Sequence, residues 1–184
     1  EISECLVGSG DVYKRQHING IIGLIENDAD RIGTLMLPQS QSSKKQFEQL
    51  LTAAKKKQIP VKWISKGDVF SLKTLPDLSF EVLWPSKNEK SDDTNESSLV
   101  WRLNYHDFSM LFTGDLPGNC EDELVSLKPV TVLKVAHHGS DYSTTKTFLQ
   151  QITPQLAVIS CSENNRYGHP GKQLLKRLEE AKIP

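Results

Sequence analysis

The last third of the chain alternates short apolar segments with amphipathic segments, and this alternation constrains the fold more than any other feature. Residues 130–136 (VTVLKVA) and 156–161 (LAVISC) have the composition of buried strands. Each is followed by a segment of helical periodicity, residues 144–152 and 171–182 respectively. Strand–helix units of this kind, preceded by alternating strands, indicate a layered α/β protein.

The first two thirds of the chain contain two further helix segments and several short strands. The predicted helices cover residues 18–27 and 42–57. We predict strands at residues 32–38, 59–65, 68–72 and 79–85, a hairpin of 98–105 with 108–114, and a short helix in 119–127. The polar segment 85–97 has no periodicity, and a loop of this length in a compact domain is often functional or mobile.

Composition and charge exclude several classes of protein. The 184 residues are 37% hydrophobic and 24% charged, which is typical of a globular domain with a real core. A net charge of −1 provides no global field for nucleic acid, so such a partner requires a local basic patch. Cys5, Cys120 and Cys161 lack the number and spacing of a disulfide framework or a thiolate zinc site. No apolar run approaches the roughly 18 residues that span a membrane.

Three clusters of polar residues each follow directly after an apolar strand. Asp115 ends MLFTGDL, His137 and His138 end VLKVAHHGS, and His169 lies in the loop after VISC. In α/β sheets the carboxyl edge of the strands is where ligands bind. Imidazole and carboxylate groups together are ligands for zinc, manganese or iron.

Each of these residues also has an ordinary structural interpretation. An aspartate after a strand is often a turn former or a helix cap, and a single loop histidine is often a surface residue. Adjacent histidines point in different directions, so at most one of His137 and His138 is a direct metal ligand, and the other acts on substrate or supports the site. We interpret His106 as a turn residue and the lysines at 55–57 as a solvated helix end.

The order LFTGDL, VLKVAHHGS and NNRYGHP resembles the metallo-β-lactamase-fold domain at the C-terminus of ComEC-type DNA-internalisation competence proteins, and stand-alone hydrolases of the same group. The segment NESSLVWRL resembles the Asn/Ser-rich strand start of that group. The resemblance covers residues 17–184. HINGIIGL matches the end of the family's early metal-binding motif, with His17 as its last histidine.

The resemblance implies a fold, a cofactor and a set of site residues. The implied fold is an αββα sandwich of two mixed sheets flanked by helices, here truncated at both ends. One or two divalent ions, zinc or manganese, would be bound by metal ligands His17, Asp115 and His137, with Asp115 as the bridging ligand. His138 and His169 would be catalytic, and the substrate-binding residues would be Asn95, Ser97, Ser98 and Ser140. The family's usual middle histidine falls near residues 95–98, where this chain has NESS, and the ComEC-like group shares that departure.

Residues 1–16 do not fit the resemblance. The hexapeptide DVYKRQ at 11–16 stands where the first metal ligands of the motif are expected. It is also the letter-for-letter translation of a common transposon sequencing linker. We therefore expect residues 1–16 to be a non-native segment and residues 17–184 to be a partial metallo-β-lactamase-like domain. The alternative is a divergent N-terminus that coincidentally spells the linker.

The implied function is that of a bacterial metal-dependent hydrolase, a phosphodiesterase or nuclease that acts on DNA in competence and DNA uptake. A second hypothesis is hydrolysis of a small ester, such as a phosphocholine-type or lactone substrate. A third is a catalytically inert binding domain of a membrane DNA-uptake channel. Under the first and third hypotheses, a parent protein with a membrane channel would tether the domain to the inner membrane through an upstream region.

The first prediction concerns metal binding by the 184 residues themselves. Because the segment before His17 lacks the early ligands of the motif, we expect this chain to bind zinc or manganese poorly and to be inactive, even where a longer relative is an enzyme. Isothermal titration calorimetry measures the stoichiometry directly. Tight binding of two ions per chain would contradict this expectation.

Overall fold

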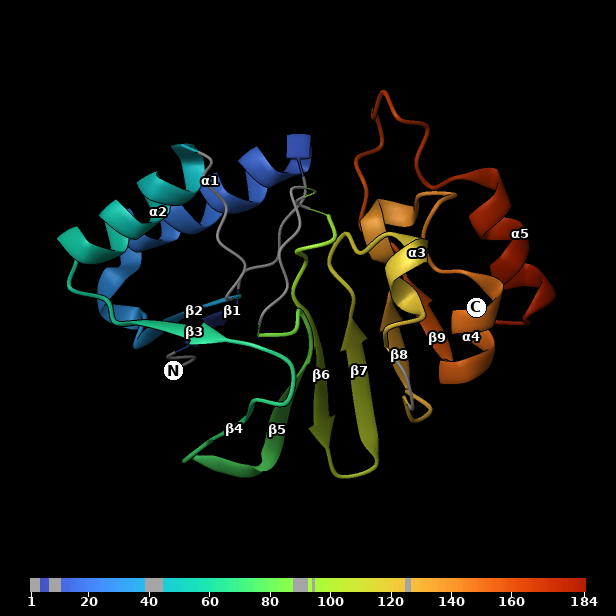
Figure 1. Ribbon diagram of the computed structural model, residues 1–184, viewed down its shortest axis with the longest axis horizontal. Coiled ribbons are helices and arrows are strands. Elements are labelled where there is room, and N and C mark those ends of the chain that lie inside the picture. Colours follow the sequence, from blue (N-terminus) through green and yellow to red (C-terminus); the bar gives the residue numbers. More distant parts are fainter. Residues whose placement is uncertain (1–3, 7–10, 39–44, 88–92, 94, 125–126) are drawn as a thin grey trace.

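The computed structural model describes residues 4–6, 11–38, 45–87, 93, 95–124 and 127–184, with the side chains of 4–6, 11–17 and 46 outside this description. Figure 1 shows two sheets with helices at either side. The helices are α1 (Asp11–Asp28), α2 (Lys45–Lys56), α3 (Gly118–Glu121), α4 (Lys146–Ile152) and α5 (Lys172–Glu180), with 3₁₀ turns η1 (Ala29–Arg31) and η2 (Ala136–Gly139). The strands are β1 (Glu4–Leu6), β2 (Thr34–Pro38), β3 (Val61–Ile64), β4 (Val69–Leu72), β5 (Leu75–Trp84), β6 (Val100–Tyr105), β7 (Phe108–Phe112), β8 (Val132–Lys134) and β9 (Leu156–Val158).

The smaller sheet has the order β1-β2-β3 and is parallel throughout its described strands. Strand β2 is buried along most of its length, as its run of apolar residues requires. Helices α1 and α2 cover one face of this sheet (left in Figure 1), where Ile25 and Leu50 pack with Leu35 and Leu37 in one apolar cluster. The apolar residues of α2 therefore lie on the face of the helix that packs on this sheet.

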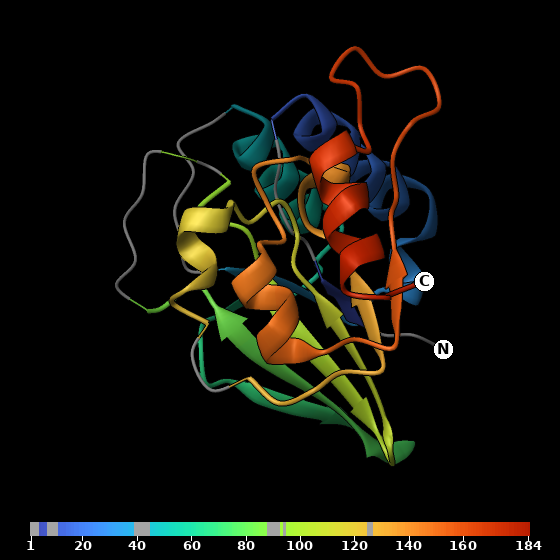
Figure 2. The ribbon, with the colours of Figure 1, turned by 90° about the vertical axis from the view of Figure 1, so that its right-hand side faces the viewer.

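The larger sheet has the order β4-β5-β6-β7-β8-β9. Its first four strands form an antiparallel meander, in which short turns join β4 to β5 and β6 to β7, and the polar segment after residue 84 joins β5 to β6. Strands β7, β8 and β9 are then mutually parallel, with Leu111 opposite Leu133 and Leu133 opposite Ala157. The carboxyl ends of these three strands consequently lie at one edge of the sheet. Helices α4 and α5 lie in front of this sheet in Figure 2.

The two sheets pack face to face around a smaller apolar cluster. Met36 and Ile64 of the small sheet contact Val82 and the chain at Leu99 beside the large sheet. A row of half-buried aromatic rings crosses the large sheet from β4 to β7, namely Phe70, Phe80, Trp101 and Phe112. The layers therefore run helix, sheet, sheet, helix, which is the predicted αββα arrangement.

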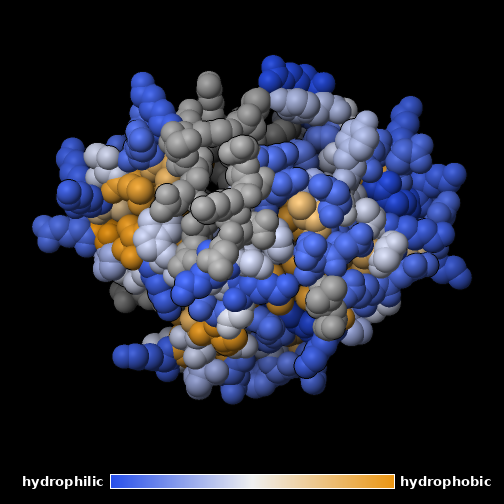
Figure 3. Space-filling view, in the orientation of Figure 1, coloured by the Kyte–Doolittle hydropathy of each residue, from blue (hydrophilic) through white to orange (hydrophobic). Residues whose placement is uncertain are grey.

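The molecular surface is mostly hydrophilic in the view of Figure 3, with apolar areas that are small and separate. No helix in the described part of the chain combines the length and the apolar composition that a membrane span requires.

The predicted elements agree with the structure except at the start of the chain. Helix α1 begins at Asp11 and not after His17, so the predicted boundary between residues 16 and 17 falls inside this helix. The non-native origin of residues 1–16 is a matter of DNA sequence and stays a prediction. Part of the polar loop 85–97 lies outside the described residues.

A buried carboxylate fixes the start of α4. Glu121 at the end of α3 accepts hydrogen bonds from the backbone N–H groups of Thr144 and Thr145, and the Thr145 side chain accepts one from Phe148 N. Burial raises the pKa of Glu121, and the hydrogen bonds from Thr145 and Thr144 oppose that rise. Backbone N–H groups at the start of a helix have no acceptor within the helix, and Glu121 accepts hydrogen bonds from two such groups.

The second prediction follows from this contact. Replacing Glu121 with Ala leaves the buried amides of Thr144 and Thr145 without their acceptor, so the free energy of unfolding should fall by roughly 1–3 kcal/mol. Urea denaturation followed by circular dichroism measures the change. Glu123→Ala is the matched control, because Glu123 is exposed and its substitution should stay within about 0.5 kcal/mol of wild type. Equal effects of the two substitutions would contradict the capping role.

Candidate functional site

Asp115 stands at the carboxyl end of β7, in a turn that only glycine makes easily. Gly114 has a φ of 55°, and a Cβ at this position would lie 3.0 Å from the Cβ of Ser98. The Asp115 N–H donates to Ser98 Oγ over 3.1 Å, and both residues are buried. The turn therefore points a buried carboxylate along the edge of the sheet at a position fixed by Ser98.

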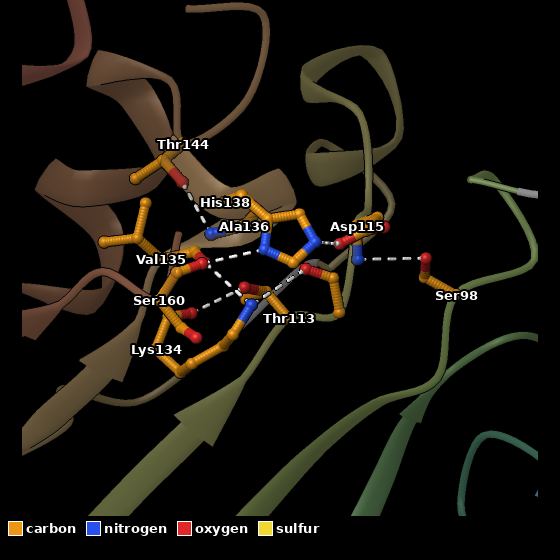
Figure 4. Close-up of polar contacts among 10 residues, drawn as sticks. Ser98, Thr113, Asp115, Lys134, Val135, Ala136, His138, Thr144 and Ser160 are labelled. Carbon is orange, nitrogen blue, oxygen red and sulfur yellow. Dashed lines mark hydrogen bonds and ion pairs between the residues drawn. The ribbon is translucent and has the colours of Figure 1, made fainter. Parts of the chain in front are cut away.

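His138 reaches the same place from the end of β8. His137 and His138 both have left-handed backbone conformations, with φ of 50° and 56°. This turn brings His138 Nε2 to 3.5 Å from Asp115 Oδ1, and the side chain of His138 is 5% exposed. Its Nδ1 lies 2.7 Å from the backbone carbonyl of Ser160, just after β9 (Figure 4).

The carbonyl of Ser160 determines which nitrogen of His138 carries a proton. A carbonyl oxygen only accepts hydrogen bonds, so Nδ1 carries a proton and donates it to Ser160, and Nε2 is the nitrogen that faces Asp115. A histidine that binds a metal through one nitrogen commonly donates its other N–H to a carbonyl in this way. The donor pair of Asp115 and His138 thus fits a divalent cation of the zinc or manganese type.

Lys134 is a third polar side chain at this edge, half-buried, and the sequence analysis missed it. Its Nζ donates to the carbonyl of Val135 over 3.1 Å and to that of Gly114 over 3.5 Å. Burial lowers the pKa of Lys134, and the nearby negative charge of Asp115 opposes this. A lysine inside the apolar run VTVLKVA was the signal that could have identified it.

His137 and His169 lie beside this pair. The backbone N–H of His137 donates to Gly114 O over 3.0 Å, and its ring centroid is 5.9 Å from that of His169. Burial lowers the pKa of His169 and the neighbouring His138 lowers it further, while Asp141 and Asp115 oppose both effects. Asn165 brackets His169, because its side chain donates to His169 O and accepts from His169 N.

The remaining predicted site residues make local contacts. Ser140 Oγ accepts from Tyr142 N, and Ser97 Oγ donates to Asp93 O over 3.4 Å. Asn95 O accepts from Ser98 N, so Asn95 helps to form the turn that places Ser98. His17 lies within α1, and its side chain is outside the described residues.

The structure therefore brings together part of the predicted set. Asp115, His138 and Ser98 are in direct contact, and His137 and His169 adjoin them. Among the side chains that the structure describes, no group of three or more His, Cys, Asp or Glu residues has the arrangement of a metal site.

Sequence comparison shows that the chain belongs to the ComEC family of competence proteins. No family model matches it. It is 35% identical over 156 residues to ComE operon protein 3 of Bacillus subtilis strain 168, which is 83% of this chain and 20% of that protein. It is 35% identical over 105 residues to competence protein ComA of Neisseria gonorrhoeae (55% of this chain, 15% of that protein) and 33% identical over 106 residues to recombination protein 2 of Haemophilus influenzae (57% and 13%). The chain spans about a fifth or less of the length of these relatives.

Structural comparison confirms the predicted metallo-β-lactamase fold. The crystal structure of CmlA, a diiron β-hydroxylase from Streptomyces venezuelae, matches with a TM-score of 0.58 over 97% of this chain and 41% of that chain. A mutant of the same protein matches with a TM-score of 0.55. The identities are 9% and 8%, so this likeness concerns the fold alone.

The third prediction tests the turn that positions Asp115. Gly114→Ala adds a Cβ against Ser98 in a left-handed conformation, so we expect a loss of roughly 1–3 kcal/mol in the free energy of unfolding. Gly168→Ala is the control, because Gly168 also has a positive φ of 70° but no atom within 4 Å of its added Cβ. Urea denaturation compares the two variants. If Gly168→Ala lowers the free energy of unfolding as much as Gly114→Ala does, the contact with Ser98 contributes nothing to the loss.

Proposed function

This chain matches one segment of the ComEC-family competence proteins and has the metallo-β-lactamase fold. We propose that in intact members of the family this domain is a metal-dependent phosphodiesterase that acts on DNA during uptake. The observation that carries the proposal is the buried contact between Asp115 and His138 at the common edge of β7, β8 and β9. Homology to proteins of competence supports DNA as the substrate class, and the donor chemistry supports a metal cofactor.

The proposed metal ligands are Asp115 and His138, with His17 contributing from α1. The contact of His138 Nδ1 with Ser160 O favours His138 over His137 as the ligand from the HHGS segment, because it aims Nε2 at Asp115. When bound, a divalent ion lowers the pKa of a water molecule and polarises a phosphoryl oxygen. Zinc and manganese both suit an oxygen and imidazole donor set.

The protein's own side chains would orient the site and move protons. Ser98 holds the backbone of Asp115, and Ser160 fixes the ring plane of His138. Lys134 is half-buried near Asp115, and its ammonium group would contribute a favourable charge interaction with that carboxylate. His169 is half-buried, and burial lowers its pKa and so favours the neutral ring, which would be able to exchange a proton with a leaving group.

The fourth prediction concerns Asp115 and is made on an intact homologue. In purified ComE operon protein 3 of Bacillus subtilis, manganese or zinc should support degradation of single-stranded DNA. Replacing the aspartate that corresponds to Asp115 with Ala should lower that rate by at least about a hundredfold, because a metal ligand and a buried charge are lost together. Gel electrophoresis of a labelled oligonucleotide measures the rate.

The matched control replaces the residue that corresponds to Asp122, which is exposed in this chain, and should leave the rate unchanged. Activity that persists without the site aspartate would overturn the proposal. Two other results would favour the remaining hypotheses. A small-ester hydrolase would bind oligonucleotide without a steep dependence on salt, and an inert binding domain would hold little metal.

A further inference from the structure

A row of rings leads outward from the buried pair to the surface. His137 lies 5.9 Å from His169, centroid to centroid, and His169 lies 5.9 Å from Tyr167 with planes only 18° apart. The guanidinium of Arg166 then lies 5.0 Å from the centre of the Tyr167 ring and donates to its hydroxyl. His137, at the inner end of this row, adjoins the site, and Tyr167, at the outer end, is 47% exposed.

The loop that carries this row is fixed at the site and projects away from it. It starts at Ser160, whose carbonyl contacts His138, and it returns at His169, which Asn165 brackets with two hydrogen bonds. Figures 1 and 2 both show the segment between β9 and α5 rising beyond the helices. The strand arrow of β7 in Figure 1 points toward the same side of the molecule. An exposed aromatic ring is thereby held near the site rather than folded into the core.

The chemistry of the row favours one kind of occupant. A flat ring next to a guanidinium stacks well on another flat π-system, and the guanidinium also attracts phosphate. A quaternary ammonium group, as in a phosphocholine ester, would meet the positive charge of Arg166 on the same ring. A nucleobase joined to phosphates satisfies both groups, whereas a base within a duplex has its faces covered by its neighbours.

We propose that Tyr167, with Arg166 and His169 beside it, is a stacking platform for an unpaired nucleobase of single-stranded DNA that enters the site. This inference rests on the proposed function and specifies its substrate class. The platform would select unpaired over duplex DNA, because only an unpaired base exposes a face to Tyr167. It makes Tyr167 a specificity residue that acts through binding and not through the reaction itself.

The fifth prediction compares two labelled single strands of about ten nucleotides, oligo-dT and a fully abasic strand, by fluorescence anisotropy with this chain in a chelator. Wild type should bind oligo-dT more tightly than the abasic strand. Tyr167→Leu, which keeps apolar bulk but removes the ring, should weaken oligo-dT binding about tenfold and leave abasic binding unchanged. Tyr167→Trp should retain or tighten oligo-dT binding.

Tyr105→Leu is the matched control, because Tyr105 is also a partly exposed tyrosine but lies at the hairpin end of β6. It should not change either affinity, and thermal denaturation verifies that the variants are folded. No preference of wild type for oligo-dT, an unchanged affinity in Tyr167→Leu, or competition of choline chloride for the same tyrosine would each overturn the platform.

The platform and the proposed function fail in different measurements. Binding in a chelator requires no metal and no reaction. Hydrolysis of bis(p-nitrophenyl) phosphate by the intact homologue requires both but involves no nucleobase. A ring-dependent preference for oligo-dT without hydrolysis would leave the platform standing and remove the phosphodiesterase. Hydrolysis without ring-dependent binding would support the phosphodiesterase and overturn the platform.

Discussion

The parallel pairing of β7, β8 and β9 is the constraint on which the rest of the site depends. Parallel strands end at one edge, so the turns after them meet although residues 115, 138 and 160 are far apart in sequence. Each turn then supplies one component of the site, a carboxylate, an imidazole or a carbonyl. Loss of the pairing between β7 and β8 would separate Asp115 from His138 even if both turns kept their local shape.

Burying polar side chains at this edge of the sheet costs free energy and also restricts their positions. A carboxylate, an imidazole and an ammonium group lie here among strands whose side chains are otherwise apolar, and each would be unfavourable alone. The hydrogen bonds from Asp115 N to Ser98 and from Lys134 to two carbonyls hold these groups in place. An arrangement that left one of these charges buried and unpaired would be several kcal/mol less stable. Few other arrangements of these side chains therefore compete with the observed one. The same low-dielectric surroundings strengthen any charge interaction that a bound substrate makes there.

The sequence alone predicted most of the elements and the location of the site, but not how its side chains meet. Apolar runs and helical stripes identified the strands and helices, because periodicity reports which face is buried. Spacing could not show that His138 and not His137 contacts Asp115, because that contact depends on two left-handed residues and on the carbonyl of Ser160, which follows β9. Lys134 was overlooked because its role comes from burial and not from its neighbours in sequence. The local hydrogen bonds of the Ser140 and Ser97 hydroxyls could not be read from the motif, and the expected contact of these serines with substrate stays a prediction.

The described side chains of the site come from one of the two halves of the fold. The large sheet and its loops supply Asp115, His138, Lys134 and His169, and the hydrogen bonds described above for these residues join positions between 98 and 169. His17 belongs to α1, which packs on the small sheet. The relative position of the carboxylate and the imidazole is therefore set within the large half of the fold, because Ser98 and Ser160, which contact Asp115 and His138, both belong to it. The loop from Ser160 to His169 is held within the same half, because Asn165 bonds the backbone of His169.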